Sequence, residues 1–227
     1  MIKCVISLIV SLMMLPAPAG AQSLEGVLAA TDPALAAAVR AAVQDKQFAA
    51  PVPAPMESSK AAPGPELYAP FHRDGIYNYE YTSTEFTGTR TLRLEFGTYS
   101  AKDASVTVRK TVFNANTPQV TAFKVYFTRR GIEADGSPLA GPRLEMPSPL
   151  TYNQTWDEGQ DRNRVAAVNT EIRTASGIHK GCVRIITRLA GGGTMNRYYA
   201  PGVGLVAEQL LTKDKQEMIS LVSCLLK

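Results

Sequence analysis

Residues 181–211 decide the fold, and they read GCVRIITRLAGGGTMNRYYAPGVGLVAEQLL. Three short runs of aliphatic, β-branched and aromatic residues are separated by two turn signals. Pro201 and Gly202 suit the central positions of a type II turn, because proline presets φ at the first and glycine accepts a positive φ at the second. The glycines at 191–193 are the other signal. The stretch therefore predicts three short strands joined by two tight turns.

The same strand signal continues on both sides of this stretch. From Leu67 onward, polar and apolar residues alternate in the way that is typical of half-buried antiparallel strands. No long helical pattern interrupts them, which argues against a parallel α/β sheet. Residues 131–149 are polar and rich in proline and glycine, and we assign no strand there. The strands expected outside the opening stretch are residues 75–83, 89–96, 105–113, 120–129, 164–173 and 217–226. The total of about nine strands predicts one antiparallel β domain over residues 67–227, either a barrel or a sandwich.

The chain before this domain has a different pattern. Lys3, the apolar run 4–15 and the small residues ending at Ala21 are typical of a secretory signal peptide (residues 1–21) cleaved after Ala21. Residues 22–49 are expected to be a helical arm, and the proline-rich residues 50–66 a linker. The apolar run is too short to span a bilayer, and no longer run follows. We therefore expect a soluble periplasmic or secreted protein with no transmembrane span.

Charge and short motifs argue against several classes of function. The formal net charge is +4, and the basic residues are scattered along the chain, so we expect no nucleic-acid partner. Only His72 and His179 could act as imidazole bases, and a surface-loop role is the simpler interpretation of each. No nucleophile elbow, metal-ligand spacing or phosphate loop occurs. We therefore expect no enzymatic activity, no metal and no cofactor.

Two cysteines, Cys182 and Cys224, remain after the leader is removed. An even number of cysteines in an oxidising compartment favours a disulfide between them. The alternative is two buried free thiols, because cysteine also packs well as a small hydrophobic residue.

Several short motifs resemble the TapB-like family of exported domains of unknown function. They are Pro149-Leu150 followed by Trp156, the strand opening at 181–183 and, above all, YYAPGVGLV at 198–206. That family is similar in fold to the periplasmic lipoprotein-carrier half-barrels. The resemblance implies a curved antiparallel sheet, a half-barrel or flattened barrel with one concave face, in a Gram-negative envelope. With the arm, the expected fold is all-β with one N-terminal helix. The family has no agreed catalytic residues, so the resemblance implies none here.

Six aromatic residues are candidates to line a ligand site on the concave face. Tyrosine rings there could hold an apolar or glycan ligand, with their hydroxyl groups at the rim. The competing interpretation is that the rings fill the core of the sheet. The candidates are Tyr77, Tyr79, Tyr81, Trp156, Tyr198 and Tyr199.

From these observations we expect an exported, non-enzymatic binding module. Its partner would be a lipid, an acylated peptide or another envelope component held in the concave face. The alternative is a structural or assembly component of an envelope complex. It would dock on an envelope protein of that complex through the N-terminal arm.

Overall fold

The computed structural model describes residues 64–69, 74–114 and 117–226. The chain divides into two compact units, residues 1–50 and 51–227, and every described residue belongs to the second. The expected signal peptide, the helical arm and most of the linker therefore lie outside the described residues. Within the described ranges, the helical structure is one short 3-10 segment, η2 (Pro65–Tyr68), and no helix has the length and hydropathy needed to cross a membrane.

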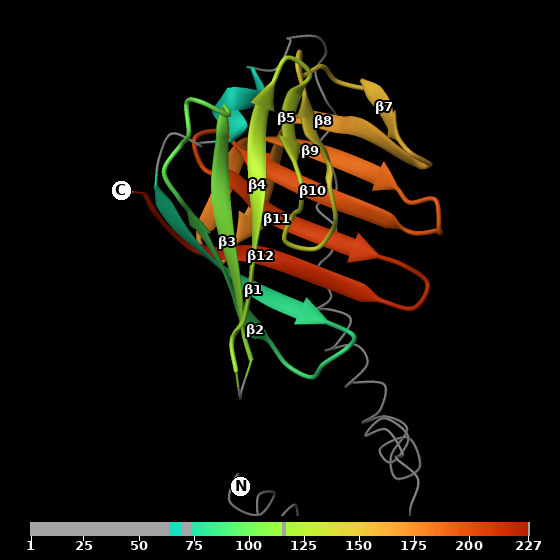
Figure 1. The fold of residues 1–227 in the computed structure, drawn as a ribbon. Helices are drawn as coiled ribbons and strands as arrows, with labels where there is room; N and C mark the ends of the chain where they lie inside the picture. Colours follow the sequence, from blue (N-terminus) through green and yellow to red (C-terminus); the bar gives the residue numbers. More distant parts are fainter. Residues whose placement is uncertain (1–63, 70–73, 115–116, 227) are drawn as a thin grey trace, which may run out of the picture. The chain divides into compact units, whose positions relative to one another are not determined.

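The described residues form one sheet of twelve antiparallel strands, in the order β6-β5-β4-β3-β2-β1-β12-β11-β10-β9-β8-β7 (Figure 1). Each strand pairs with its neighbours in sequence except β6 and β7, which form the two edges, and β1 also pairs with β12, which joins the two ends of the domain in the middle of the sheet. This confirms the all-β antiparallel fold. The strands are β1 Gly75–Ser83, β2 Arg90–Phe96, β3 Ser105–Phe113, β4 Gln119–Thr128, β5 Gly131–Ala134, β6 Arg143–Pro147, β7 Thr155–Glu158, β8 Asp161–Thr174, β9 Gly177–Arg188, β10 Thr194–Ala200, β11 Gly204–Leu211 and β12 Gln216–Leu226.

The alternation of side chains explains which face of the sheet is buried. On β1, Tyr77 and Tyr79 are buried while Glu80 is exposed. Their cross-strand partners on β2 are Leu94 and Leu92, which are also buried. Neighbouring strands thus add apolar side chains to the same face, and such cross-strand pairs are a main source of sheet stability.

The turn expected at Pro201 and Gly202 forms in the structure. The amide of Val203 donates to the carbonyl oxygen of Ala200 at 3.2 Å, and Gly202 has φ of 72°. These features match a type II turn with Pro201 and Gly202 at its centre. In the other turn, Gly193 has φ of 108°, and a Cβ there would lie 2.2 Å from the carbonyl oxygen of Leu211. Glycine is therefore required at that position for both conformation and space.

The structure contains three strands that the alternation did not reveal. β5 and β6 lie in the passage 131–149, and β7 precedes β8. β5 and β7 have four residues each, too few for a periodic signal. β6 alternates polar and apolar residues only over Arg143–Met146 before Pro147, which is too short a run to stand out in a passage rich in proline and glycine. The expectation that residues 131–149 form no strand is wrong for this reason.

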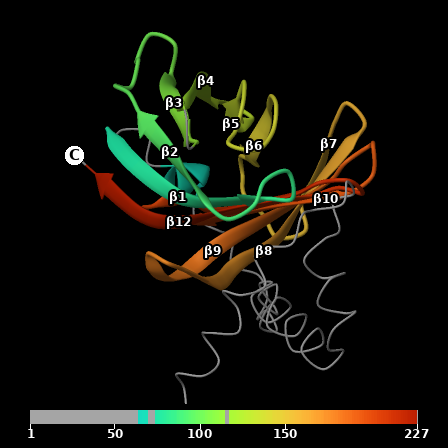
Figure 2. The same ribbon diagram turned by 90° about the horizontal axis from the view of Figure 1, so that it is seen from below.

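The sheet curls until its two edge strands approach each other. Figure 2 shows β3–β6 turned over toward β10 and β7. At the edges, the backbone amide of Leu144 on β6 donates to the carboxylate of Glu158 on β7. Register shifts along the β8–β9 ladder, between Val165 and Ala167 among others, are the kind of irregularity that bends a strand. The result is a nearly closed barrel-shaped sheet whose edges meet through side chains and not through a backbone ladder.

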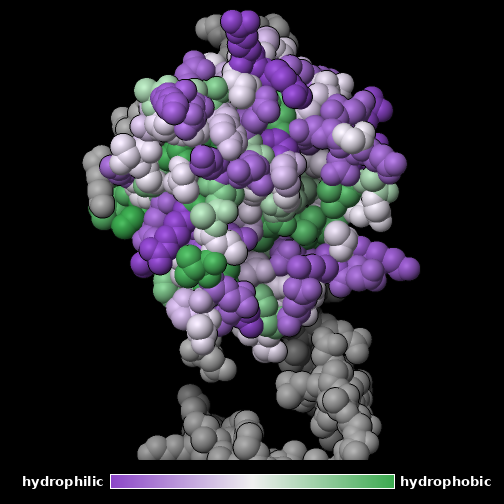
Figure 3. Space-filling model, viewed as in Figure 1, coloured by the Kyte–Doolittle hydropathy of each residue, from purple (hydrophilic) through white to green (hydrophobic). Residues whose placement is uncertain are grey.

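The interior of the curled sheet holds the hydrophobic core. Its members include Tyr77, Leu92, Val108, Ile185 and Leu221, which come from β1, β2, β3, β9 and β12. On the face seen in Figure 3, hydrophilic residues predominate and hydrophobic ones form smaller patches between them.

The expected disulfide does not form. Cys182 on β9 is fully buried, Cys224 on β12 is exposed, and both thiols are free. β10 and β11 lie between these strands, at about 4.8 Å per strand, so the two cysteines are too far apart to be bonded. The prediction was wrong because the number of cysteines carries no information about strand order. The Sγ–H of Cys182 instead donates to the carbonyl oxygen of His179 at 3.3 Å.

Candidate functional site

A cavity of about 70 Å³ lies inside the curled sheet. Its walls come from η2 and from β1, β2, β4, β5, β6, β10 and β11, so both halves of the sheet contribute. Most of the lining is apolar. The polar side chains that reach it, besides tyrosines, are Ser137, Glu145 and Glu208.

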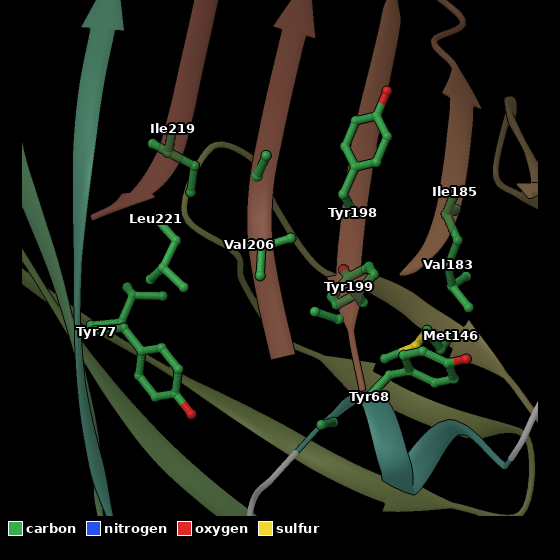
Figure 4. Close-up of a cluster of buried hydrophobic side chains, with 14 of the residues drawn as sticks. Tyr68, Tyr77, Met146, Val183, Ile185, Tyr198, Tyr199, Val206, Ile219 and Leu221 are labelled. Carbon is green, nitrogen blue, oxygen red and sulfur yellow. The ribbon is translucent and has the colours of Figure 1, made fainter. Parts of the chain in front are cut away.

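The short η2 segment closes one side of this cavity. The amide of Gly202 donates to the carbonyl oxygen of Leu67 at 2.8 Å, and the hydroxyl group of Tyr68 donates to the carbonyl oxygen of Gly181 at 3.3 Å. These two bonds attach η2 to the start and the central turn of residues 181–211. Tyr68 then packs against the interior near Met146 and Tyr199, as Figure 4 shows.

Two tyrosines of β1 form an aromatic wall. The Tyr77 ring packs edge-on against Phe96, with 5.1 Å between ring centroids. The hydroxyl group of Tyr79 donates to the carbonyl oxygen of Leu205 at 2.8 Å, and burial raises the pKa of this phenol well above its usual value. Tyr79 is thus a neutral, hydrogen-bonded wall residue.

A buried ion pair spans the interior between β6 and β10. A guanidinium Nη1 of Arg197, which is fully buried, donates to the carboxylate of Glu145 at 2.7 Å. The hydroxyl group of Tyr199 donates to the same carboxylate oxygen at 2.5 Å. Arg143, also on β6, lies 3.5 Å from the second carboxylate oxygen. Glu145 therefore faces two guanidinium groups and one phenol.

These contacts decide the charge state of the pair. Burial by itself raises the pKa of Glu145, but Arg197, Arg143 and the hydrogen bond from Tyr199 outweigh it, and the pKa falls below its usual value. Burial likewise opposes the charge of Arg197, and Glu145 more than compensates, so its pKa rises. Both groups are charged at neutral pH.

Glu208 on β11 is in the opposite situation. Its side chain is fully buried, and burial raises its pKa to about 7; Arg143 lowers the pKa and Glu145 raises it. Oε1 accepts a hydrogen bond from Ser137 at 3.3 Å, while Oε2 has no hydrogen-bond partner among the described residues. A buried polar atom without a partner is costly, so Oε2 marks a place where a further polar group would be stabilising.

Polar residues of β8 and β9 contact the other side of the Arg197 guanidinium, and a residue of β7 joins the network through one of them. Arg197 Nη2 donates to Asn163 at 3.2 Å and to Thr187 at 2.9 Å. Asn163 in turn donates to Glu158 at 3.2 Å, and Glu158 also receives the backbone amide of β6. The network thus joins the two edges of the sheet through its interior.

The structure brings together only half of the six aromatic candidates. Tyr77, Tyr79 and Tyr199 line the cavity. Tyr81 lies in a separate polar groove, where its hydroxyl group donates to Glu217. Tyr198 points to the other face of β10, and Trp156 is half-buried on β7 with no hydrogen-bond partner for its indole nitrogen among the described residues. These three do not line the cavity.

The second histidine, His179, lies on β9, where it pairs with Ile172 on β8 close to the turn between the two strands, so it is not in a surface loop as the sequence suggested. His179 Nε2 is 2.9 Å from the Ser176 hydroxyl oxygen and 3.2 Å from that of Thr174. Among the described residues, no carboxylate is hydrogen-bonded to its ring to complete a triad. No group of three or more metal-ligating side chains forms there either. His72 lies outside the described residues, and the absence of catalysis stays a prediction.

The charged residues of the interior were not recognised from the sequence, although two of them carry a signal. In an expected strand, Arg197 lies two residues from Met195 and two from Tyr199, so it shares their apolar face. Glu208 shares a face with Val206 in the same way. Glu145 carries no such signal, because it falls with Arg143 at the polar positions of its short strand, the face that the pattern assigns to solvent. A charged residue at an inward strand position was therefore the sign that was missed.

Comparison with known proteins finds similarity in solved structures alone. No protein-family model matches the chain, and no curated protein matches it. One similar structure is described as "a putative lipoprotein" from Parabacteroides distasonis ATCC 8503, at 13% identity over 74% of this chain and 100% of that one, with a TM-score of 0.42. Another, from Bacteroides fragilis NCTC 9343, is described as "a putative exported protein with YmcC-like fold", at 12% identity over 67% of this chain and 95% of that one, with a TM-score of 0.46.

Proposed function

We propose that this chain is an exported, non-enzymatic binding module, and that its ligand is a slender apolar chain bearing one polar group, such as the end of a lipid or of an acylated peptide. The observation that carries the proposal is the interior cavity, whose mostly apolar lining includes Glu208, a residue whose Oε2 has no hydrogen-bond partner among the described residues. Ligand sites commonly combine apolar walls with a few polar groups that orient the ligand. The leader pattern and the resemblance to the TapB-like family support export.

The size of the cavity limits what can enter. Ligand pockets usually measure about 300–1,000 Å³, far more than the 70 Å³ found here. Only the end of a chain fits without movement. Phe96, Phe123, Val203 and Leu205 line the cavity and are only half-buried, so they form the wall that would move for a deeper ligand.

Binding can be tested by filling the cavity. Ala134 is buried in its wall, so Ala134→Leu places a larger side chain there. Ala122→Leu is the matched control, because Ala122 is exposed on neighbouring β4. The probe is 1-decanol, a slender alkyl chain whose hydroxyl group can donate to Glu208, and binding is followed by calorimetry. We expect Ala134→Leu to weaken binding about tenfold, or about 1.4 kcal/mol, and the control to leave it unchanged.

Two results would overturn this proposal. One is wild-type protein that does not bind the probe, and the other is equal binding by Ala134→Leu and Ala122→Leu. Thermal unfolding of each variant identifies a folding defect, in which case Ala134→Val repeats the test with a smaller change. Export is tested separately by fractionating cells and sequencing the N-terminus of the mature protein, which we expect to begin at Gln22. A retained leader in the cytosol would contradict that part alone.

A further inference from the structure

A second concave site lies on the opposite face of the same sheet. It is a groove of about 410 Å³ over β7, β8, β9 and β10. Its lining includes four arginines and no acidic residue. The arginines are Arg162, Arg164, Arg184 and Arg188.

The alternation of side chains places these arginines outside the barrel. On β8, Asn163 and Val165 are buried, while Arg162 and Arg164 are exposed. On β9, Ile185 and Thr187 are buried, and Arg184, Ile186 and Arg188 point the other way. The inward-facing Asn163 also borders the groove, but no residue lines both the groove and the apolar cavity of the interior.

The positions of the arginines put like charges side by side. Arg162 and Arg188 are direct cross-strand partners, at about 4.5–5.5 Å between Cβ atoms. Arg164 follows Arg162 on the same face, about 7 Å along the strand. Like charges directly opposite each other in a sheet are destabilising, so this arrangement has a cost in the free protein.

In the described part of the chain, none of these four arginines forms an ion pair. The ion pairs there involve other cations, Arg109, Arg130, Arg143, Arg197 and Lys215. Asp157 is opposite Arg162 in register, yet the two form no ion pair.

One of the four guanidinium groups is already held in place. Arg184 donates to Asn196 Oδ1 through Nε at 3.3 Å and through Nη2 at 2.8 Å. Its guanidinium also lies 5.5 Å from the centroid of the Tyr198 ring. These contacts reduce the side-chain entropy that Arg184 would lose when an anion binds.

We propose that this groove binds a soluble polyanion carrying two or more neighbouring phosphate groups. Guanidinium groups match phosphate oxygens in paired hydrogen bonds, and a bound polyanion would relieve the repulsion between Arg162 and Arg188. Ile186 is the one large apolar residue of the lining, and it is half-buried. The groove has no exposed apolar side chains to insert into a bilayer, which favours a soluble ligand over a lipid headgroup in a membrane.

The proposal is tested by titrating the full chain with inorganic tripolyphosphate in a calorimeter at low salt. The groove variant is Arg164→Gln combined with Arg188→Gln; both side chains are exposed and make no ion pair with a described residue. The control is Arg129→Gln combined with Arg173→Gln, two exposed arginines outside the groove, which gives the same change in net charge.

We expect the groove variant to bind at least about tenfold more weakly, because it loses two charge-assisted contacts, and the control to stay within about twofold of wild type. Binding should also weaken steeply as salt is added. Equal loss in both variants would show an effect of net charge alone and overturn the proposal. The proposal would also be overturned if the protein co-sediments with vesicles containing phosphatidylglycerol but does not bind tripolyphosphate. Neither variant removes a buried contact, so the control should unfold at the wild-type temperature, and the groove variant at that temperature or slightly above it because Arg188→Gln relieves the repulsion with Arg162.

Discussion

The buried guanidinium of Arg197 offers the sharpest test of how the barrel is held together. In Arg197→Met, a linear apolar side chain of similar length takes its place and removes the charge. The change deletes hydrogen bonds to Glu145, Asn163 and Thr187 at 2.7, 3.2 and 2.9 Å. Glu145 then keeps only Arg143 and Tyr199 as partners for a buried charge. Removing one partner of a buried ion pair typically costs about 3–5 kcal/mol of unfolding free energy.

The loss can be measured by urea unfolding. Trp156 is the single tryptophan, so its fluorescence reports the transition without interference. With a slope of about 2 kcal/mol per molar urea, the expected loss lowers the midpoint by about 1.5–2.5 M. Arg109→Met is the matched control, because Arg109 is 61% exposed and its ion pair with Glu95 spans 3.6 Å. An exposed pair of this kind contributes at most about 1 kcal/mol.

A double variant distinguishes the cost of an unpaired charge from the worth of the pair. Arg197→Met combined with Glu145→Met removes both charges, and such replacements are often close to neutral. The double variant should therefore be more stable than Arg197→Met alone. The reasoning fails if Arg197→Met unfolds within about 1 kcal/mol of wild type, or if adding Glu145→Met destabilises the protein further.

Two further predictions follow from the titrating groups of the interior and from the free thiols. Because the folded-state pKa of Glu208 is raised to about 7 from 4.5, its contribution to stability is full below about pH 4.5 and is lost as pH rises through 7, a change of about 3 kcal/mol. The unfolding free energy of wild type relative to that of Glu208→Gln, measured by urea unfolding, should therefore be lower at pH 8 than at pH 5. An equal difference at the two pH values would contradict the assignment. For the thiols, Cys224 is exposed, whereas burial raises the pKa of Cys182 to about 11. The folded mature protein should show one thiol that reacts rapidly with a disulfide reagent, and the denatured protein two. If the denatured protein shows no reactive thiol, the two cysteines form a disulfide and the prediction is wrong.

The turn chemistry and most strands could be predicted because each depends on neighbouring residues. The alternation in β1 and the Pro201-Gly202 turn are local consequences of backbone geometry. The same logic fails for β5, β6 and β7, which have four or five residues each and are too short to show a period. The candidate site was predicted in part, since Tyr77, Tyr79 and Tyr199 line the cavity while the charged residues beside them were overlooked.

From the sequence alone follow an all-β antiparallel domain, the place of its principal turns, and tyrosine-rich strand faces. The tertiary structure decided which edges meet, which cysteines stay apart, and which charges are buried together. Arg197 and Glu145 are 52 residues apart, and the four arginines of the outer groove are scattered over two strands with no basic run. The physical reason is that backbone periodicity acts over a few residues. The partners of a buried charge and the neighbours in a groove are set by how the whole sheet curls and by which distant strands it brings together.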